Sequence, residues 1–135
     1  MDLYCTFKLN NEIYGINVSD IQEIINVPKF TNVPRSKSYL KGVFSLRGQV
    51  VTNICLSTLF NKNSDQQFGH SLVIHSNSDP LSINVNEILD IIEISTSDIE
   101  PIPDSIPDKI KQYLIGIKKN DEQIITILDV NKIEI

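Results

Sequence analysis

The sequence contains few of the residues from which catalytic and metal sites are usually built. Its 135 residues include no tryptophan, two cysteines and two histidines, and the cysteines and histidines do not follow a zinc-ligand spacing. Glycine-rich phosphate loops, GxSxG elbows and HExxH motifs are also absent. We therefore expect no enzyme activity, no metal site and no cofactor. Cys5 and Cys55 lie in apolar, strand-like surroundings, so we expect both to be reduced thiols, either in the core or half-buried.

Long apolar runs are missing as well. No segment approaches the ~18 consecutive apolar residues of a membrane helix, and residues 1–11 do not resemble a signal peptide. With 41% hydrophobic and 21% charged residues, the composition is that of an ordinary globular protein. We expect a single domain over residues 1–135, located in the cytoplasm.

Acidic residues are absent from a long central stretch. None occurs between residues 24 and 64, a segment that includes Lys29, Arg35, Lys37, Lys41 and Arg47. Residues 1–60 hold six basic and four acidic residues, whereas residues 61–135 hold six and thirteen. The stretch is either an ordinary solvated face or a basic patch for an acidic partner, and both interpretations stay open.

Residues 39–60 carry the clearest strand-turn-strand signal. Two β-favouring runs, 40–46 and 49–56, are separated only by Arg47 and Gly48, which predicts a β-hairpin. We expect Gly48 alone to take the left-handed conformation, in a type II or bulged type I turn, with Arg47 projecting from a rigid tip. Because apolar residues occur on both faces, we expect the hairpin to be buried between layers, at a junction.

The second half of the sequence repeats the first. Residues 16–21 recur 67 positions later as 83–88, and from residue 39 onward the offset is 74, so that Gly42 matches Gly116. The seven extra residues lie between Pro101 and Tyr113. There, residues 105–108 resemble a capping box at the start of a short helix.

Each half shows the same predicted order of elements. Each half begins with a hairpin, at 4–9 and 12–18 in the first half and at 71–75 and 81–85 in the second, and a second hairpin follows later. In the first half, the segment between the two hairpins contains a helical turn at 19–22 and a strand at 24–27. A short helical segment at 57–60 ends that half. Five short strands per roughly 60 residues are typical of a small closed barrel. We predict an all-β fold of two five-stranded, SH3- or OB-like barrels that share a core. The halves span about 4–60 and 70–134, joined by a polar connector at 61–69.

A series of short motifs identifies a family. They are F-x-L at 7–9, Y-G-I at 14–16, V-x-x-I-x-E-I-I at 18–25, V-P-R-S at 33–36, Y-x-K-G-V-x-x-L-R-G-Q-V-V at 39–51, G-I-x-K from 116 and I-L-D-V-N-K-I at 127–133. In this order and spacing they resemble the CheW family of chemotaxis coupling proteins over residues 4–133. The resemblance implies that the two barrels are intertwined. It also implies a non-catalytic adaptor that couples the cytoplasmic tips of chemoreceptors to the histidine kinase CheA in membrane-associated arrays.

The resemblance also implies two binding surfaces. Arg47, with Lys41, Gly42 and Gly48 around it and Glu23 as its ionic partner, is expected to shape the receptor-binding groove. A second set, Val18 and Ile21, is expected to contact the regulatory domain of the kinase. Plain core packing is the alternative for both of these apolar residues.

Four residues depart from the usual family pattern, and we expect them to affect partner affinity more than fold: Ser45, Thr52, Cys55 and Asn86. A coupling protein of a pilus or receiver-linked pathway is an alternative within the same class. A barrel that binds single-stranded nucleic acid through Phe30, Tyr39 and Phe44 is a second alternative, although the pI near 4.9 argues against it. A small hydrolase is a third.

Overall fold

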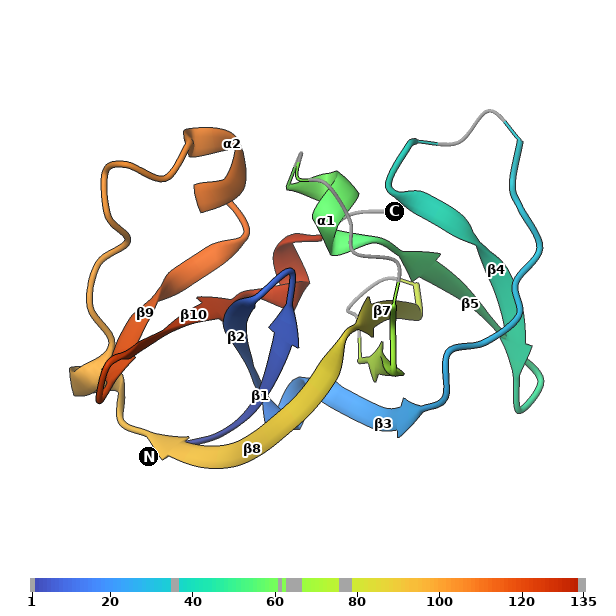
Figure 1. The fold of residues 1–135 in the computed structure, drawn as a ribbon. Helices are drawn as coiled ribbons and strands as arrows, with labels where there is room; N and C mark the ends of the chain where they lie inside the picture. Colours follow the sequence, from blue (N-terminus) through green and yellow to red (C-terminus); the bar gives the residue numbers. More distant parts are fainter. Residues whose placement is uncertain (1, 35–36, 61, 63–66, 76–78, 134–135) are drawn as a thin grey trace.

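Ten strands and a few very short helices make up the fold (Figure 1). The structure is a computed structural model that describes residues 2–34, 37–60, 62, 67–75 and 79–133. The strands are β1 (Asp2–Leu9), β2 (Glu12–Asn17), β3 (Ile21–Ile25), β4 (Leu40–Leu46), β5 (Gln49–Ile54), β6 (His70–Ile74), β7 (Leu81–Val85), β8 (Glu87–Ile94), β9 (Leu114–Asn120) and β10 (Gln123–Leu128). The helices are α1 (Leu56–Leu59) and α2 (Asp108–Lys111), with 3₁₀ turns η1 (Val18–Asp20), η2 (Thr96–Asp98) and η3 (Val130–Lys132).

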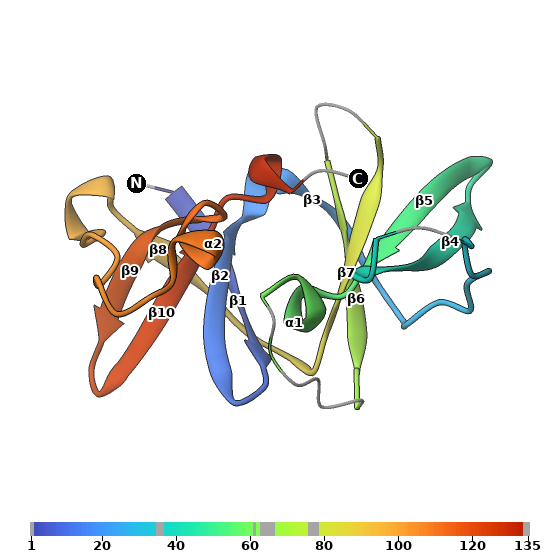
Figure 2. The same cartoon turned by 90° about the horizontal axis from the view of Figure 1, so that it is seen from above.

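The strands form two five-stranded sheets of identical topology. Sheet A has the order β8-β1-β2-β10-β9, and sheet B has the order β3-β6-β7-β5-β4. If β1 to β5 are matched with β6 to β10, one order becomes the other. Each sheet therefore contains one hairpin from the other half of the chain: β1–β2 joins β8 to β10, and β6–β7 joins β3 to β5. Figure 2 shows the two sheets side by side, with α1 between them.

Neither sheet is closed into a barrel, so the predicted closed barrels are not confirmed. The edges are β8 and β9 in sheet A and β3 and β4 in sheet B. In the described chain, a single isolated bridge in each sheet joins one edge strand to the segment that follows the other: Thr31–Val43 joins the segment after β3 to β4, and Glu100–Ile117 joins the segment after β8 to β9. Each of these segments contains a proline, Pro28 three residues before Thr31 and Pro101 directly after Glu100. Because proline has no backbone N–H, a continuous ladder cannot form there.

Several predicted elements agree with the structure and two differ. The hairpin around Asn10 and Asn11 has positive φ at both residues, as its sequence predicts. The strand expected at 24–27 begins earlier, at Ile21, because the helical turn ends at Asp20. The capping box expected at 105–108 is wrong: Pro107 is the N-cap of α2, without a side-chain cap. Proline disfavours helical dihedrals at the residue before it, so Pro107 opposes a helix that begins at Ile106.

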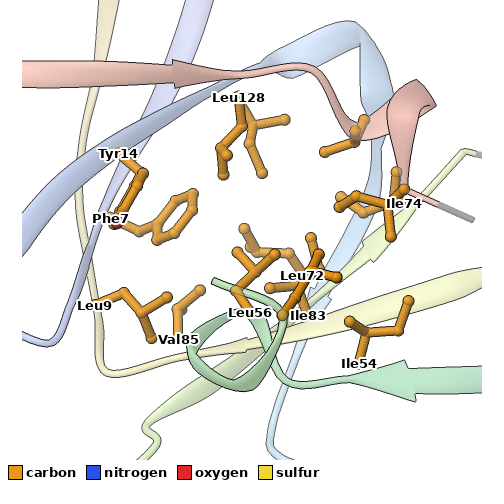
Figure 3. Close-up of a cluster of buried hydrophobic side chains, with 14 of the residues drawn as sticks. Phe7, Leu9, Tyr14, Ile54, Leu56, Leu72, Ile74, Ile83, Val85 and Leu128 are labelled. Carbon is orange, nitrogen blue, oxygen red and sulfur yellow. The ribbon is translucent and has the colours of Figure 1, made fainter. Parts of the chain in front are cut away.

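A large apolar core is shared by the two sheets (Figure 3). Its fully buried members come from the exchanged hairpins, from β5 and β10, and from the short helical segments: Phe7, Leu9, Ile16, Ile54, Leu56, Leu72, Ile74, Leu81, Ile83, Val85 and Leu128 among them. Burying each such side chain contributes about 1.5–3 kcal/mol before entropy is counted. A second, smaller cluster lies within sheet A and includes Tyr4, Ile94, Ile125 and Ile127. The larger cluster is thus continuous across both sheets, and the smaller one belongs to sheet A.

The remaining expectations can be placed briefly. Cys5 and Cys55 are buried free thiols, as expected, and burial raises the pKa of Cys5. Of the predicted connector, residues 61 and 63–66 lie outside the described residues, as does Arg35 of the basic stretch. No helix in the described part of the chain is long and apolar enough to cross a membrane.

Candidate functional site

The β4–β5 hairpin ends in a tighter turn than the sequence predicts. Leu46 pairs with Gln49, which leaves a loop of two residues. Both have positive φ, 49° at Arg47 and 79° at Gly48. Positive φ at both positions is typical of a type I′ turn, whose twist matches that of the strands it joins. The expectation of a left-handed Gly48 alone is therefore wrong, because a two-residue loop requires Arg47 to adopt that conformation too.

This hairpin lies at the edge of the molecule and not at a junction between layers. Strand β4 is the outer strand of sheet B, at the right of Figure 1. Val51 on β5 is fully buried, whereas its neighbour Val50 is 65% exposed. The apolar residues on both faces thus reflect one core face and one exposed apolar face. The predicted burial between two layers is wrong.

Arg47 and Glu23 form an ion pair, as expected. The Nη1 group of Arg47 donates to Oε1 of Glu23. Glu23 lies on β3, so this ion pair connects the two opposite edges of sheet B, across the gap that the Thr31–Val43 bridge also spans. The Arg47 side chain is 72% exposed and that of Glu23 only 22%. The carboxylate therefore holds one nitrogen of a guanidinium that otherwise faces solvent.

Lys41 and Gly42 lie at the far end of the same strand. Lys41 is the extra residue of a β-bulge, since Leu40 pairs with Ile54 and Gly42 with Asn53. Arg47 lies six residue steps along the chain from Lys41, a length of about 20 Å at 3.3 Å per residue. The five predicted receptor residues therefore do not form one cluster. Glu23, Arg47 and Gly48 lie together, and Lys41 and Gly42 lie apart from them.

Gly42 has a packing role, and it is one of the residues that the sequence repeat matches between the two halves, with Gly116 as its counterpart. A Cβ at Gly42 would lie 2.4 Å from the carbonyl oxygen of Thr31, and its φ is +157°. The same crossing occurs in sheet A, where a Cβ at Gly116 would lie 2.5 Å from the carbonyl oxygen of Glu100. Both glycines allow the chain that leaves an edge strand to cross the opposite edge of the sheet.

The two predicted kinase residues are close to each other at the start of β3. Val18 lies in η1 and Ile21 begins β3, and both are half-buried. Ile21 packs against the shared core and pairs with Ile74 of β6. Asp20 lies between Val18 and Ile21 in the sequence. Burial raises the pKa of Asp20, the negative charge of Asp129 raises it further, and His75 opposes this shift. Core packing thus accounts for part of the Ile21 side chain, and a smaller part of its surface is still accessible.

A buried polar cluster in sheet B was not predicted. Asn53 donates from Nδ2 to Oγ of Ser82 at 2.8 Å and to Oδ1 of Asn84 at 3.0 Å. Asn84 in turn donates from Nδ2 to Oδ1 of Asn53 at 3.2 Å. All three side chains are buried. The available signal was their position, because Asn and Ser at inward-facing sites of apolar strands must find partners.

Exposed apolar residues also occur at matched positions. Ile24 and Val50 of sheet B are 44% and 65% exposed, and their counterparts in sheet A, Ile91 and Ile124, are 61% and 54% exposed. Phe30, Tyr39 and Phe44 are each half-buried, so they do not present an exposed series for stacking bases. The surface therefore favours apolar protein contacts.

Comparisons with known proteins agree with this geometry. The family description "CheW-like domain" matches residues 3–134. The chain is 31% identical over 129 residues to "Chemotaxis protein CheW" of Helicobacter pylori, covering 94% of this chain and 78% of that protein. It is 25% identical over 134 residues to the protein of the same name of Treponema pallidum, covering 95% and 79%.

A solved structure has the same fold. The scaffolding protein TtCheW from Thermoanaerobacter tengcongensis superposes with a TM-score of 0.88 at 22% identity, covering 99% of this chain and 88% of that one. The family match confirms the prediction of a non-catalytic chemotaxis adaptor. Two open sheets that exchange hairpins, the Arg47–Glu23 pair and these matches lead to one assignment: the chain belongs to the CheW family of chemotaxis coupling proteins.

Proposed function

We propose that this protein couples the cytoplasmic tips of chemoreceptors to the histidine kinase CheA, in the cytoplasm at membrane-associated arrays. Membership of the CheW family supports this role. The two sheets also present matched but different outer surfaces, which suits a protein with two kinds of partner. A flagellar or a pilus pathway would use the same surfaces.

The receptor surface is centred on Arg47. Its guanidinium has five N–H donors in a planar fork, of which Glu23 takes one, so the others are available for carbonyls or carboxylates of a receptor helix. Val50, three residues away, adds an exposed apolar contact. Such a combination fits an amphipathic helix laid against the hairpin. The observation that carries the proposal is an arginine fixed by a mostly buried carboxylate but itself 72% exposed.

The other predicted receptor residues contribute in different ways. Gly48 allows the type I′ turn that holds Arg47. Gly42 keeps the crossing segment against β4 and so fixes the position of the hairpin. Lys41, at the other end of β4, would contact a more distant part of the receptor tip.

Charge reversal tests the receptor surface. We expect Arg47→Glu to weaken binding of a receptor-tip fragment tenfold or more, about 1.4 kcal/mol or greater, and to leave affinity for the kinase regulatory domain unchanged. Lys119→Glu is the matched control, because Lys119 is an exposed cation that pairs with Glu100 at 3.7 Å in the equivalent hairpin of sheet A. Equal loss for both partners, or the same receptor loss in the control, would contradict the proposal.

The kinase surface is centred on Val18 and Ile21. Both are half-buried, at the junction between η1 and β3, so each keeps some surface for a partner. We expect Ile21→Asp to abolish binding of the kinase regulatory domain with a small change in Tm. The counterpart Ile88→Asp is the control, since Ile88 also packs against the shared core. Unfolding of Ile21→Asp together with lost binding would show that Ile21 serves the core alone.

A further inference from the structure

Sheet B contains a cavity whose lining shares only Lys41 with the proposed receptor and kinase surfaces. Its volume is about 230 Å³, and it lies among β4, the segment that follows β3, the start of α1 and β7. The apolar part of its lining is Val27, Phe30 and Phe68, and the remaining lining residues are Lys41, Cys55, Thr58 and Asn84. The cavity has the volume of roughly seven or eight waters at about 30 Å³ each, which suits a small organic molecule.

The walls of the cavity are held in place by features described above. A Cβ at Gly42 would lie 2.7 Å from Cδ2 of Phe30, so the absent side chain of Gly42 lets this ring pack against β4. Asn84 is buried and is held by two hydrogen bonds with Asn53. The bulge in β4 gives Lys41 its position at the cavity.

The charge of the cavity is positive. Among the residues that the structure describes, no carboxylate lies within ion-pair distance of Lys41. The described lining contains no acidic side chain, because most of it comes from the acid-free residues 24–64. An ammonium group beside apolar walls attracts an anion that carries an apolar body.

We propose that this cavity binds a small apolar carboxylate. The ring or alkyl part of the ligand lies among Val27, Phe30 and Phe68, and its carboxylate accepts hydrogen bonds from Nζ of Lys41. This inference is independent of the receptor and kinase, since the binding requires neither partner.

The repeat supplies an internal comparison. In sheet A, Ile115 takes the place of Lys41 and Asp129 takes the place of Cys55. The cation is therefore replaced by an apolar residue, and a carboxylate is added whose charge already raises the pKa of Asp20. Because sheet A has no cation in place of Lys41 and has a carboxylate in place of Cys55, we expect binding at the sheet B cavity alone.

Titration of the whole protein with benzoate, followed by ¹⁵N–¹H NMR, tests the proposal. We expect saturable shifts at the amides of Cys55 and Thr58, both of which line the cavity, and at least tenfold weaker binding of the neutral isostere benzamide. Lys41→Gln should weaken benzoate binding tenfold or more. The control Lys29→Gln, an exposed lysine outside the cavity, should leave it unchanged.

A second variant separates the cavity from a surface charge effect. Val27→Phe adds a ring to the cavity wall and should abolish benzoate binding, while the amide signals away from the cavity stay those of the folded protein. The proposal is overturned if benzoate causes no saturable shifts, if benzamide binds equally well, or if Lys41→Gln or Val27→Phe retains wild-type affinity.

Discussion

Sheets A and B share a backbone but differ in the side chains placed on it. Strand order and the crossing glycines are the same in both, and so are the bulges, with Lys41 in β4 and Ile115 in β9 as extra residues. At the hairpin tips, however, Arg47 of sheet B corresponds to Asp121 of sheet A, and Glu23 corresponds to Asp90. An ion pair at this place is thus possible only in sheet B. The two halves of the chain thus share an architecture and differ in the charges at their hairpin tips.

The interiors of the two sheets differ as well. Asn53, which bonds Ser82 in sheet B, corresponds to Ile127, and Ser82 corresponds to Gly15. Cδ1 of Ile127 lies 3.3 Å from where a Cβ of Gly15 would be, so the isoleucine fills the space left by the glycine. One sheet therefore joins its parallel strand pair through hydrogen bonds and the other through apolar packing.

The strongest test of the shared backbone is to add a methyl group at both crossings. We expect Gly42→Ala and Gly116→Ala each to lower the free energy of unfolding by about 2–4 kcal/mol, because the Cβ would overlap a backbone carbonyl. Urea denaturation followed by circular dichroism measures the change. Gly48→Ala is the control: its Cβ would meet nothing within 4 Å and carries only the cost of positive φ, about 1–2 kcal/mol. If Gly42→Ala or Gly116→Ala lowered the free energy of unfolding by less than Gly48→Ala does, the two sheets would not be equivalent at their crossings.

The buried polar cluster should give a smaller effect that is confined to sheet B. We expect Asn53→Ala to destabilise the protein by about 2 kcal/mol, because it removes the partners of buried Ser82 and Asn84. A double-mutant cycle with Asn84→Ala should show non-additivity of at least about 0.5 kcal/mol. The exposed Asn131→Ala should change stability by less than about 0.5 kcal/mol. Additive losses at Asn53 and Asn84 would mean that the two amides act separately.

The surface ion pairs should contribute least. Double-mutant cycles for Arg47–Glu23 and Lys119–Glu100 should both give coupling energies of about 0 to 1 kcal/mol that fall as salt is added. We expect the larger value for Arg47–Glu23, because Glu23 is 22% exposed whereas Glu100 is 48% exposed. A larger coupling in the Lys119 pair would reverse this part of the comparison.

Local sequence predicted the hairpins well, because alternation and turn residues act over a few positions. Asn10 and Asn11 specify their turn by their own tolerance of positive φ. The left-handed conformation of Arg47 was not predicted, since arginine has no such preference and is forced by the register of Leu46 and Gln49. The turn type there follows from strand pairing and not from the residue.

Long-range features were harder to predict. The repeat indicated two like units and marked Gly42 with Gly116, but not which strands pair, because pairing partners such as β1 and β8 lie far apart in the chain. For the site, the motif correctly predicted Glu23 as the partner of Arg47. The motif also grouped Lys41 with Arg47, but an extended strand separates residues of one motif by about 3.3 Å per position, so these two lie far apart in space. Binding by these residues stays a prediction.

The exchanged hairpins set the order in which this chain can fold during synthesis. When the ribosome has completed β1 and β2, the strands that flank them in sheet A, β8 and β10, have not yet been made. Strands β3, β4 and β5 likewise wait for β6 and β7 before sheet B can form. Neither half can complete a sheet by itself, so the nascent chain exposes the edges of β1 and β2, which β8 and β10 cover in the finished sheet, until β10 emerges. Pairings this distant in sequence also fold slowly, so these edges stay exposed for longer in the growing polypeptide than those of a hairpin that pairs locally.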